Sequence, residues 1–287
     1  MKSRVKNGLL SQTDRTNIDF VTNSNKFTSR LDVFKCTNGI RPNEFSVIVG
    51  PSGNGKSTLC KTISVECAIG GKTCYHILSE ERSDVYMSTI SSVFEKMCDG
   101  KSPDKYLERL FFESMLDWDE KERNVEHFFT NLEDVINDLC PDMVIFDNFT
   151  TSFMGELNIN VQASMIARLR KMAAAYEIAI VGVFHTAKGT DIYKRILDGE
   201  SVRGNASTTN AGAYNYVLST YFRTKPARAI IHIDKARYHS EANKTYYEML
   251  YDKELGIFVK DKKIEYNDIK KILDDANGVK KNANRGY

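Results

Sequence analysis

The sequence predicts an α/β fold, in which a mainly parallel, twisted sheet is flanked by helices and antiparallel hairpins extend it towards the C-terminus. Apolar, β-branched runs of strand length alternate with amphipathic stretches of helix length. Several of the runs are apolar throughout, as expected of strands buried on both faces of a parallel sheet. With 41% hydrophobic and 27% charged residues, the composition is that of an ordinary globular chain and gives no support to a disordered, collagen-like or membrane class.

The N-terminal half alternates predicted strands with predicted helices. Residues 45–50, FSVIVG, predict a strand that runs into a glycine-rich turn, and the helix after this turn should end at Gly70 and Gly71. The next predicted elements are a strand at 73–80, a helix through about Met97, a strand at 109–114, a helix over about 121–139 and a strand at 143–147.

The C-terminal half begins with the same alternation and ends in short strands. The amphipathic stretch 161–177 predicts a helix, and a buried strand at 178–184 follows it and stops at His185. Four short strands should pair as hairpins that extend the sheet, at 216–222, 227–234, 244–250 and 256–259. The expected organisation is an N-terminal arm or linker at 1–30, a core at 31–260, and a C-terminal helix and tail at 261–287.

Charge, cysteine spacing and hydropathy restrict the class of protein further. The 40 basic and 38 acidic residues give a net charge of +2, so any nucleic-acid surface must be a local loop or groove. The six cysteines form no CxxC pair and lie within or beside apolar segments, which predicts reduced, buried thiols and neither disulfides nor a zinc site. No apolar run approaches ~18 residues and no signal peptide is recognisable, so we expect a cytoplasmic protein.

The glycine-rich turn predicts a phosphate-binding loop. Residues 50–57, GPSGNGKS, match the pattern GxxxxGK[ST] at every fixed position, between a buried strand and a helix. In such a loop the backbone N–H groups wrap the phosphates, Lys56 bridges them and Ser57 ligates magnesium. We therefore expect ATP and Mg²⁺ to bind the chain at Gly50, Pro51, Ser52, Gly53, Asn54, Gly55, Lys56, Ser57 and Thr58.

Acidic and imidazole side chains stand at the ends of three further strands. Asp147 could hold the magnesium ion if its strand lies beside the phosphate-binding strand, although solvated acids are also common at strand ends. Glu80 or Glu81 could deprotonate an attacking water, or the two could form a plain surface pair. His185 could sense the γ-phosphate, although a lone histidine is more often structural.

The motifs GPSGNGKST, ILSEE, MVIFDN, VFHTAKG and IHIDKAR, in this order, resemble the RecA-like replicative helicases of the DnaB and RepA type. FHTAKG is similar to the histidine motif of the RepA-like branch. The resemblance covers about residues 38–259 and implies a RecA-like P-loop NTPase core that assembles as a six-subunit ring. It further implies a catalytic glutamate, a Walker B aspartate and a sensor histidine, at Glu81, Asp147 and His185.

Two basic regions have roles only through this resemblance. Lys235 and Arg237 match a Lys-x-Arg pair that reaches into the neighbouring subunit's active site; without the resemblance they would be a solvated basic edge. By the same resemblance, the segment 186–212 lies where these helicases have their central DNA-contacting loop. A long solvated loop is the alternative, but a structureless stretch of this length is uncommon in a compact domain unless it is functional or disordered. Its expected DNA contacts are Lys188, Lys194, Arg195, Arg203 and Gly204.

The function expected from these residues is an ATP-dependent, ring-forming DNA helicase that acts on single-stranded DNA in replication. A RecA- or KaiC-like ATPase that regulates an assembly without unwinding would share every catalytic residue and is the alternative. A nucleotide-gated binding module with little turnover is a weaker one. The separate N-terminal domain of DnaB-type helicases has no counterpart here, so contact with a primase or a loader would fall to the short arm or to other proteins.

Overall fold

The computed structural model describes residues 27, 29–97, 103–152, 157–186, 211–221 and 228–283. The described strands form one sheet in the order β3-β2-β4-β5-β1-β6-β7-β8-β9. The strands are β1 (Phe45–Gly50), β2 (Cys74–Leu78), β3 (Leu110–Ser114), β4 (Met143–Asp147), β5 (Ala179–His185), β6 (Tyr214–Tyr221), β7 (Arg228–Ala236), β8 (Thr245–Asp252) and β9 (Ile257–Ile264). The predicted α/β class is confirmed.

The six strands from β3 to β6 are mutually parallel, so their carboxyl ends meet at one edge of the sheet. β1, β2, β4 and β5 are buried along their whole length, which explains why their sequences are apolar throughout and do not alternate. The loop after β1 and the residues that follow β2, β4 and β5 are therefore brought to the same edge.

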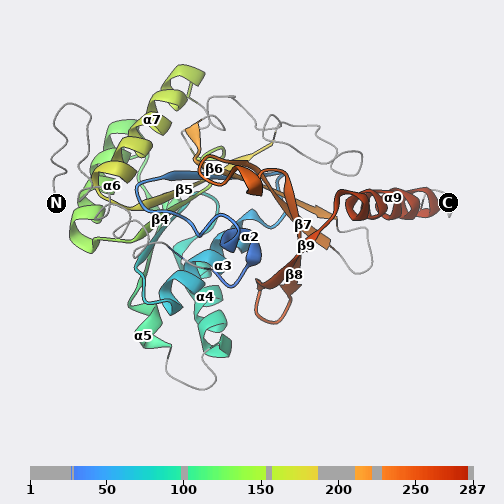
Figure 1. Ribbon diagram of the computed structural model, residues 1–287. Helices are drawn as coiled ribbons and strands as arrows, with labels where there is room; N and C mark the ends of the chain where they lie inside the picture. The colour runs from blue at the N-terminus through green and yellow to red at the C-terminus, as the bar shows by residue number, and fades with distance from the viewer. Residues whose placement is uncertain are drawn as a thin grey trace, which may run out of the picture.

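Helices cover both faces of this parallel region (Figure 1). On one face α3 (Lys56–Ile69), α4 (Ser83–Met97), α5 (Asp104–Leu107) and the short α2 (Asp32–Lys35) pack with one apolar cluster, which includes Ile48, Ile63 and Ile90. On the other face α6 (Val125–Leu139) and α7 (Ile159–Ala175) pack with a second cluster, which includes Phe128 and Leu169. In the described part of the chain no helix is long and apolar enough to cross a membrane.

The predicted hairpins of the C-terminal half are confirmed, because β6 pairs antiparallel with β7, β7 with β8, and β8 with β9. The sequence did not indicate how they join the sheet, which is by parallel pairing of β6 with β1. β9 also runs to Ile264, past the expected start of the last helix, because residues 261–264 pair with β8. The last helix, α9, then spans Tyr266–Ala283 and lies at the C-terminal end of the described chain (Figure 1).

Two further boundaries differ from the sequence prediction. α6 begins at Val125 and not near residue 121, because the Asn124 side chain caps it by accepting a hydrogen bond from the His127 N–H. At the end of the expected arm, Phe27 is buried and pairs with Ile40 across an isolated bridge, so this part of the arm contacts the core.

Candidate active site

The loop between β1 and α3 has the backbone that a phosphate-binding loop requires. Gly53 and Gly55 have positive φ angles of 72° and 83°, a conformation that side chains rarely adopt. A Cβ on Gly50 would lie 2.5 Å from the Leu218 carbonyl oxygen of β6, so no larger residue fits there. The Thr220 hydroxyl donates to the Asn54 carbonyl oxygen at 2.9 Å and ties the loop to the same strand.

The side chains of this loop leave cationic and N–H donor groups without full partners. Lys56 is 4% exposed, and its ammonium donates to the Pro51 carbonyl oxygen at 2.7 Å. Burial lowers the pKa of Lys56 to about 8, although the charges of Asp147 and Glu80 act in the opposite direction. The Asn54 side-chain amide nitrogen is also buried and has no hydrogen-bond partner within the described chain. An anion such as a phosphate would satisfy both groups.

Asp147 is the last residue of β4, and its side chain meets Ser57, the second residue of α3. Its carboxylate accepts a hydrogen bond from the Ser57 hydroxyl, and its pKa is raised to about 6, mainly by burial. The Ser57 contact and the Lys56 charge limit this rise. A hydroxyl and a carboxylate that already meet form an oxygen donor set that suits a hard divalent cation.

The position of Asp147 corrects one sequence-based expectation. β4 does not lie beside the phosphate-binding strand: β5 separates the two, pairing with β1 on one side and with β4 on the other. Asp147 nevertheless reaches the loop, because α3 crosses over the parallel strands and brings Ser57 to it.

The acidic pair lies just beyond β2, and its two members differ. β2 ends at Leu78, so Glu80 and Glu81 stand on the following turn and not within the strand. Glu80 is exposed, whereas Glu81 is half-buried and its carboxylate forms an ion pair with Lys61 of α3 at 2.8 Å. The Ser114 hydroxyl at the end of β3 donates to the Glu81 carbonyl oxygen at 2.8 Å, which fixes the backbone of the turn.

His185 ends β5, as predicted, and is linked to the end of β4. Its Nε2 lies 3.1 Å from the side-chain nitrogen of Asn148, the residue after Asp147. The Asn148 oxygen accepts hydrogen bonds from the backbone N–H and the hydroxyl of Thr151, both at 2.8 Å. No spacing in the sequence marks Asn148 as functional, although it directly follows Asp147 in the motif MVIFDN. It is the residue that joins the expected sensor to the expected metal ligand.

Lys235 and Arg237 are not brought to this edge of the sheet. Ala236 is paired with Tyr214 at the start of β6, and Tyr214 is level with Ser46 at the start of β1. Arg237 is exposed, and the Lys235 pKa is lowered by burial and by the positive charges of Arg237 and Arg170. The pair therefore lies at the opposite edge from the phosphate-binding loop, near the exposed Arg170 of α7, which no motif marks.

A groove of about 1030 Å³ adjoins the phosphate-binding loop and was not foreseen from the sequence. Gly53, Gly55 and Thr58 form one wall, and β7, β8 and β9 form the other. Two aromatic residues, Tyr251 and Phe258, are among its lining residues. No motif marks these residues, because they come from antiparallel strands remote in sequence from the loop.

The expected DNA-contacting residues lie outside the described part of the chain. They are Lys188, Lys194, Arg195, Arg203 and Gly204. The described residues that flank them are His185 and Thr186 at the end of β5 and Ala211 before β6.

Comparison with known proteins identifies one family. Residues 17–191, more than half of the chain, match the AAA domain family AAA_25. The match contains the phosphate-binding loop, Glu81, Asp147 and His185. A search of curated proteins gave no match.

Proposed function

Because the chain belongs to the AAA domain family, whose members are P-loop NTPases, we propose that it is an ATP-dependent, ring-forming helicase that translocates on single-stranded DNA during replication. The observation that carries this proposal is the position of Lys235 and Arg237. They lie at the edge of the sheet opposite the phosphate-binding loop, where they cannot serve their own active site. A ring is built from head-to-tail interfaces that join two different surfaces of each subunit, so in the proposed ring this edge of one subunit would face the nucleotide of the next.

The distance between the two edges supports this assignment. Ser46, the second residue of β1, is level with Tyr214 and through it with Ala236, whereas Gly50, the last residue of β1, begins the loop. At ~3.3 Å per residue, these levels are about 13 Å apart along the strands, and the phosphates lie beyond Gly50. The charges of Arg237 and Arg170 lower the pKa of Lys235, and that of Asp234 acts in the opposite direction, so three basic side chains and one acidic side chain give this edge a net positive charge that would attract an anion of the next subunit.

The residues of the active site divide the chemistry between them. Lys56 and the loop N–H groups bind the phosphates, and the Lys56 ammonium exchanges the Pro51 carbonyl for a phosphate oxygen. Ser57 and Asp147 would hold Mg²⁺, which when bound neutralises charge on the phosphate oxygens. The Glu81 carboxylate accepts the proton of the attacking water. Water beside the phosphates is limited by the burial of Lys56 and Asp147.

The groove beside the loop gives the rest of the nucleotide a place. Its volume of about 1030 Å³ exceeds the needs of a base and a ribose, and Phe258 lies beside Gly55. An aromatic ring stacks on any of the four bases, so this groove supports nucleotide binding without setting a base preference.

The hydrogen bonds of Asn148 offer a route from chemistry to movement. Asn148 follows the metal ligand Asp147 and contacts His185, which stands directly before the segment 186–212. A change in the contacts of Asp147 on hydrolysis would thus reach the first residues of that segment through two hydrogen-bonded side chains. This connection is what couples the ATPase to a DNA grip.

ATPase assays with and without single-stranded DNA test the proposal. We expect multiple turnovers of ATP, a rate that rises when single-stranded DNA is added, and strand displacement on a forked duplex. An ATPase rate that does not change on adding single-stranded DNA, together with no strand displacement, would instead favour the RecA- or KaiC-like regulator. Failure to turn over more than once would leave only a nucleotide-gated binding module.

A further inference from the structure

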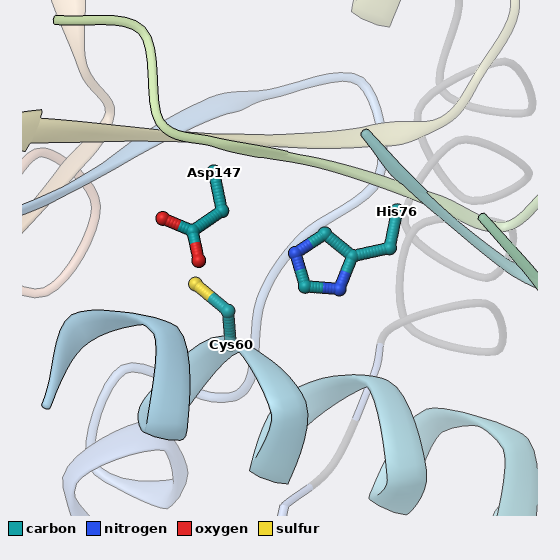
Figure 2. A group of neighbouring side chains, drawn as sticks. All are labelled: Cys60, His76 and Asp147. Carbon is teal, nitrogen blue, oxygen red and sulfur yellow. The ribbon is translucent and has the colours of Figure 1, made fainter. Parts of the chain in front are cut away.

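Three side chains that no motif connects meet in the interior, directly below the nucleotide site. They are Cys60 of α3, His76 of β2 and Asp147 of β4, and all three are buried. One ligand atom of each, a sulfur, a ring nitrogen and a carboxylate oxygen, lies within 4.8 Å of the other two. Figure 2 shows the three side chains converging from three separate elements on one point.

The imidazole of His76 is arranged as metal-binding imidazoles are. Its Nδ1 is hydrogen-bonded to the hydroxyls of Tyr86 at 2.7 Å and Ser64 at 3.2 Å, whereas its Nε2 is buried with no hydrogen-bond partner in the described chain. In Figure 2 one ring nitrogen faces Cys60 and Asp147. Burial and the Lys61 charge lower the pKa of His76 to about 3, so the ring is neutral. With the proton on Nδ1, a lone pair points into the group.

We propose that Cys60, His76 and Asp147 form a binding site for Zn²⁺ or a similar transition-metal ion, which shares only Asp147 with the magnesium site. A thiolate, an imidazole and a carboxylate are the ligands that zinc takes, whereas magnesium avoids sulfur. Around a tetrahedral zinc with bonds of ~2.0–2.3 Å, ligand atoms lie about 3.3–3.8 Å apart. Since the ligand atoms already lie within 4.8 Å of one another, they need to approach by at most about 1.5 Å, and a water completes the coordination.

The sequence predicts no zinc site, because it contains no CxxC pair and the three ligands are far apart in the chain. The fold supplies them: α3 lies against β2 and β4, so the fourth residue after Lys56 faces strand residues from both. Burial raises the pKa of the Cys60 thiol well above its usual value, so this thiol stays protonated without a metal. Metal binding displaces its proton to solvent.

Occupation of this site would switch off the neighbouring one. Asp147 also accepts a hydrogen bond from Ser57, so a transition metal that draws the carboxylate towards Cys60 and His76 withdraws it from the magnesium position. Zn²⁺ would therefore act as an inhibitor of nucleotide turnover. This consequence rests on the proposed ATPase activity, whereas binding of the metal does not.

Cobalt(II) titration of the nucleotide-free, full-length protein tests the binding. Ligation by a thiolate gives cobalt a charge-transfer band in the near ultraviolet, which we expect in the wild type and in Cys67→Ala. Cys67 is the matched control, a buried thiol on the same helix that is hydrogen-bonded to Cys74. Cys60→Ala should lose the band, and His76→Gln should bind cobalt at least ~10-fold more weakly. Thermal unfolding without metal checks that each variant is folded.

A second experiment measures the inhibition of ATP hydrolysis by Zn²⁺ at fixed concentrations of Mg²⁺ and ATP. The inhibitory concentration should rise at least ~10-fold in Cys60→Ala and His76→Gln and stay unchanged in Cys67→Ala. A thiolate band that is absent from the wild type, or that persists in folded Cys60→Ala, overturns the site. If the protein proves to have no ATPase activity, the cobalt spectra still decide the matter.

Discussion

Lys61 Nζ lies 2.8 Å from Glu81 Oε1, and the two side chains are only 13% and 25% exposed. The same ammonium lies over the ring of Tyr86 in α4, 5.5 Å from its centroid, so it contacts both the carboxylate and an aromatic ring. An ion pair that is fixed by packing on both sides loses less to solvent screening and side-chain entropy than an exposed one. Lys61 is thus placed to hold the expected catalytic carboxylate in one position.

We predict that Lys61→Met lowers kcat for ATP by roughly tenfold, because a misplaced general base reacts poorly even when it is present. KM for ATP should change little, since Lys61 contacts Glu81 and not the phosphate-binding loop. Steady-state kinetics give both constants. Lys61→Arg, which keeps the charge, should recover most of kcat, and a kcat in Lys61→Met equal to the wild-type value would show that the pair has no part in catalysis.

The two acidic residues after β2 should respond differently to the same change. Glu81→Gln keeps the shape of the side chain but removes its basicity, so hydrolysis should fall by roughly 10²-fold or more while nucleotide and magnesium still bind. Glu80 is exposed, and Glu80→Gln should remain active. Turnover and equilibrium binding of a fluorescent nucleotide separate the two effects. Loss of turnover in Glu80→Gln alone would assign the base to the other residue.

The buried imidazole of His76 should make the free energy of unfolding depend on pH. Its pKa is about 3 in the folded state, below the usual 6.5, because burial disfavours the charged ring. Between these two values the unfolded chain binds a proton that the folded state excludes, so the stability is complete above 6.5 and decreases as the pH falls towards 3. The slope approaches ~1.4 kcal/mol per pH unit.

His76→Gln removes this titration and serves as the comparison. Urea unfolding at about pH 7.5 and about pH 5, with a chelator present, should show the wild type losing about 2 kcal/mol more than the variant. Equal losses in the two proteins would mean that the pKa of His76 in the folded state is not lowered from its ordinary value.

Most of the fold could be predicted from local sequence patterns, such as continuous apolar runs and helix-ending glycines. β1, β4 and β5 could be placed because strands buried on both faces are continuous apolar runs, and α3 because two glycines end it. The antiparallel pairing of β6 with β7 was predicted, but the parallel pairing of β6 with β1 could not be inferred, because it depends on long-range packing, here the close approach of Gly50 to Leu218. The start of α6 was missed because Asn124 interrupts an otherwise helical composition.

The same distinction separates what was predictable in the site. The phosphate-binding loop is contiguous in the chain, so its spacing was sufficient to find it. Cys60, His76 and Asp147 come from three elements, and only the crossing of α3 over the sheet brings them together. The Lys61–Glu81 ion pair could not be predicted either, because a lysine on a helix and an acid on a turn 20 residues later have no recognisable spacing.

Single-stranded DNA affinity should identify the grip that we propose for residues 186–212. Phosphate contacts release counterions, so log affinity should fall with log salt at about −0.7 per phosphate neutralised. Lys194→Ala and Arg203→Ala should each reduce this slope by somewhat under one unit and weaken all sequences about equally. ATPase without DNA is the control and should survive. If both variants bind and unwind like the wild type at every salt concentration, the segment is not the grip and the regulator becomes the better proposal.

Arg237 should act on the nucleotide of a neighbouring subunit. Its edge of the sheet is about 13 Å, along the strands, from the level of Gly50, which is too far for a guanidinium to reach its own phosphates. An arginine that stabilises charge on the transferred phosphate contributes on the order of 10³ or more in rate. Arg237→Ala should therefore abolish most turnover, as should Lys56→Ala, which removes the charge that binds the phosphates.

Mixing the two inactive variants distinguishes action between subunits from action within one. In a mixed ring, some interfaces pair an intact Lys56 of one subunit with an intact Arg237 of the next, so part of the ATPase activity should return. The assembly state of the mixture, measured by native mass spectrometry, confirms that the subunits have exchanged. Because each protein alone lacks one essential group at every interface, recovered turnover can come only from interfaces that join the two. Mixed rings that remain inactive would place the arginine within its own subunit's site or outside catalysis altogether.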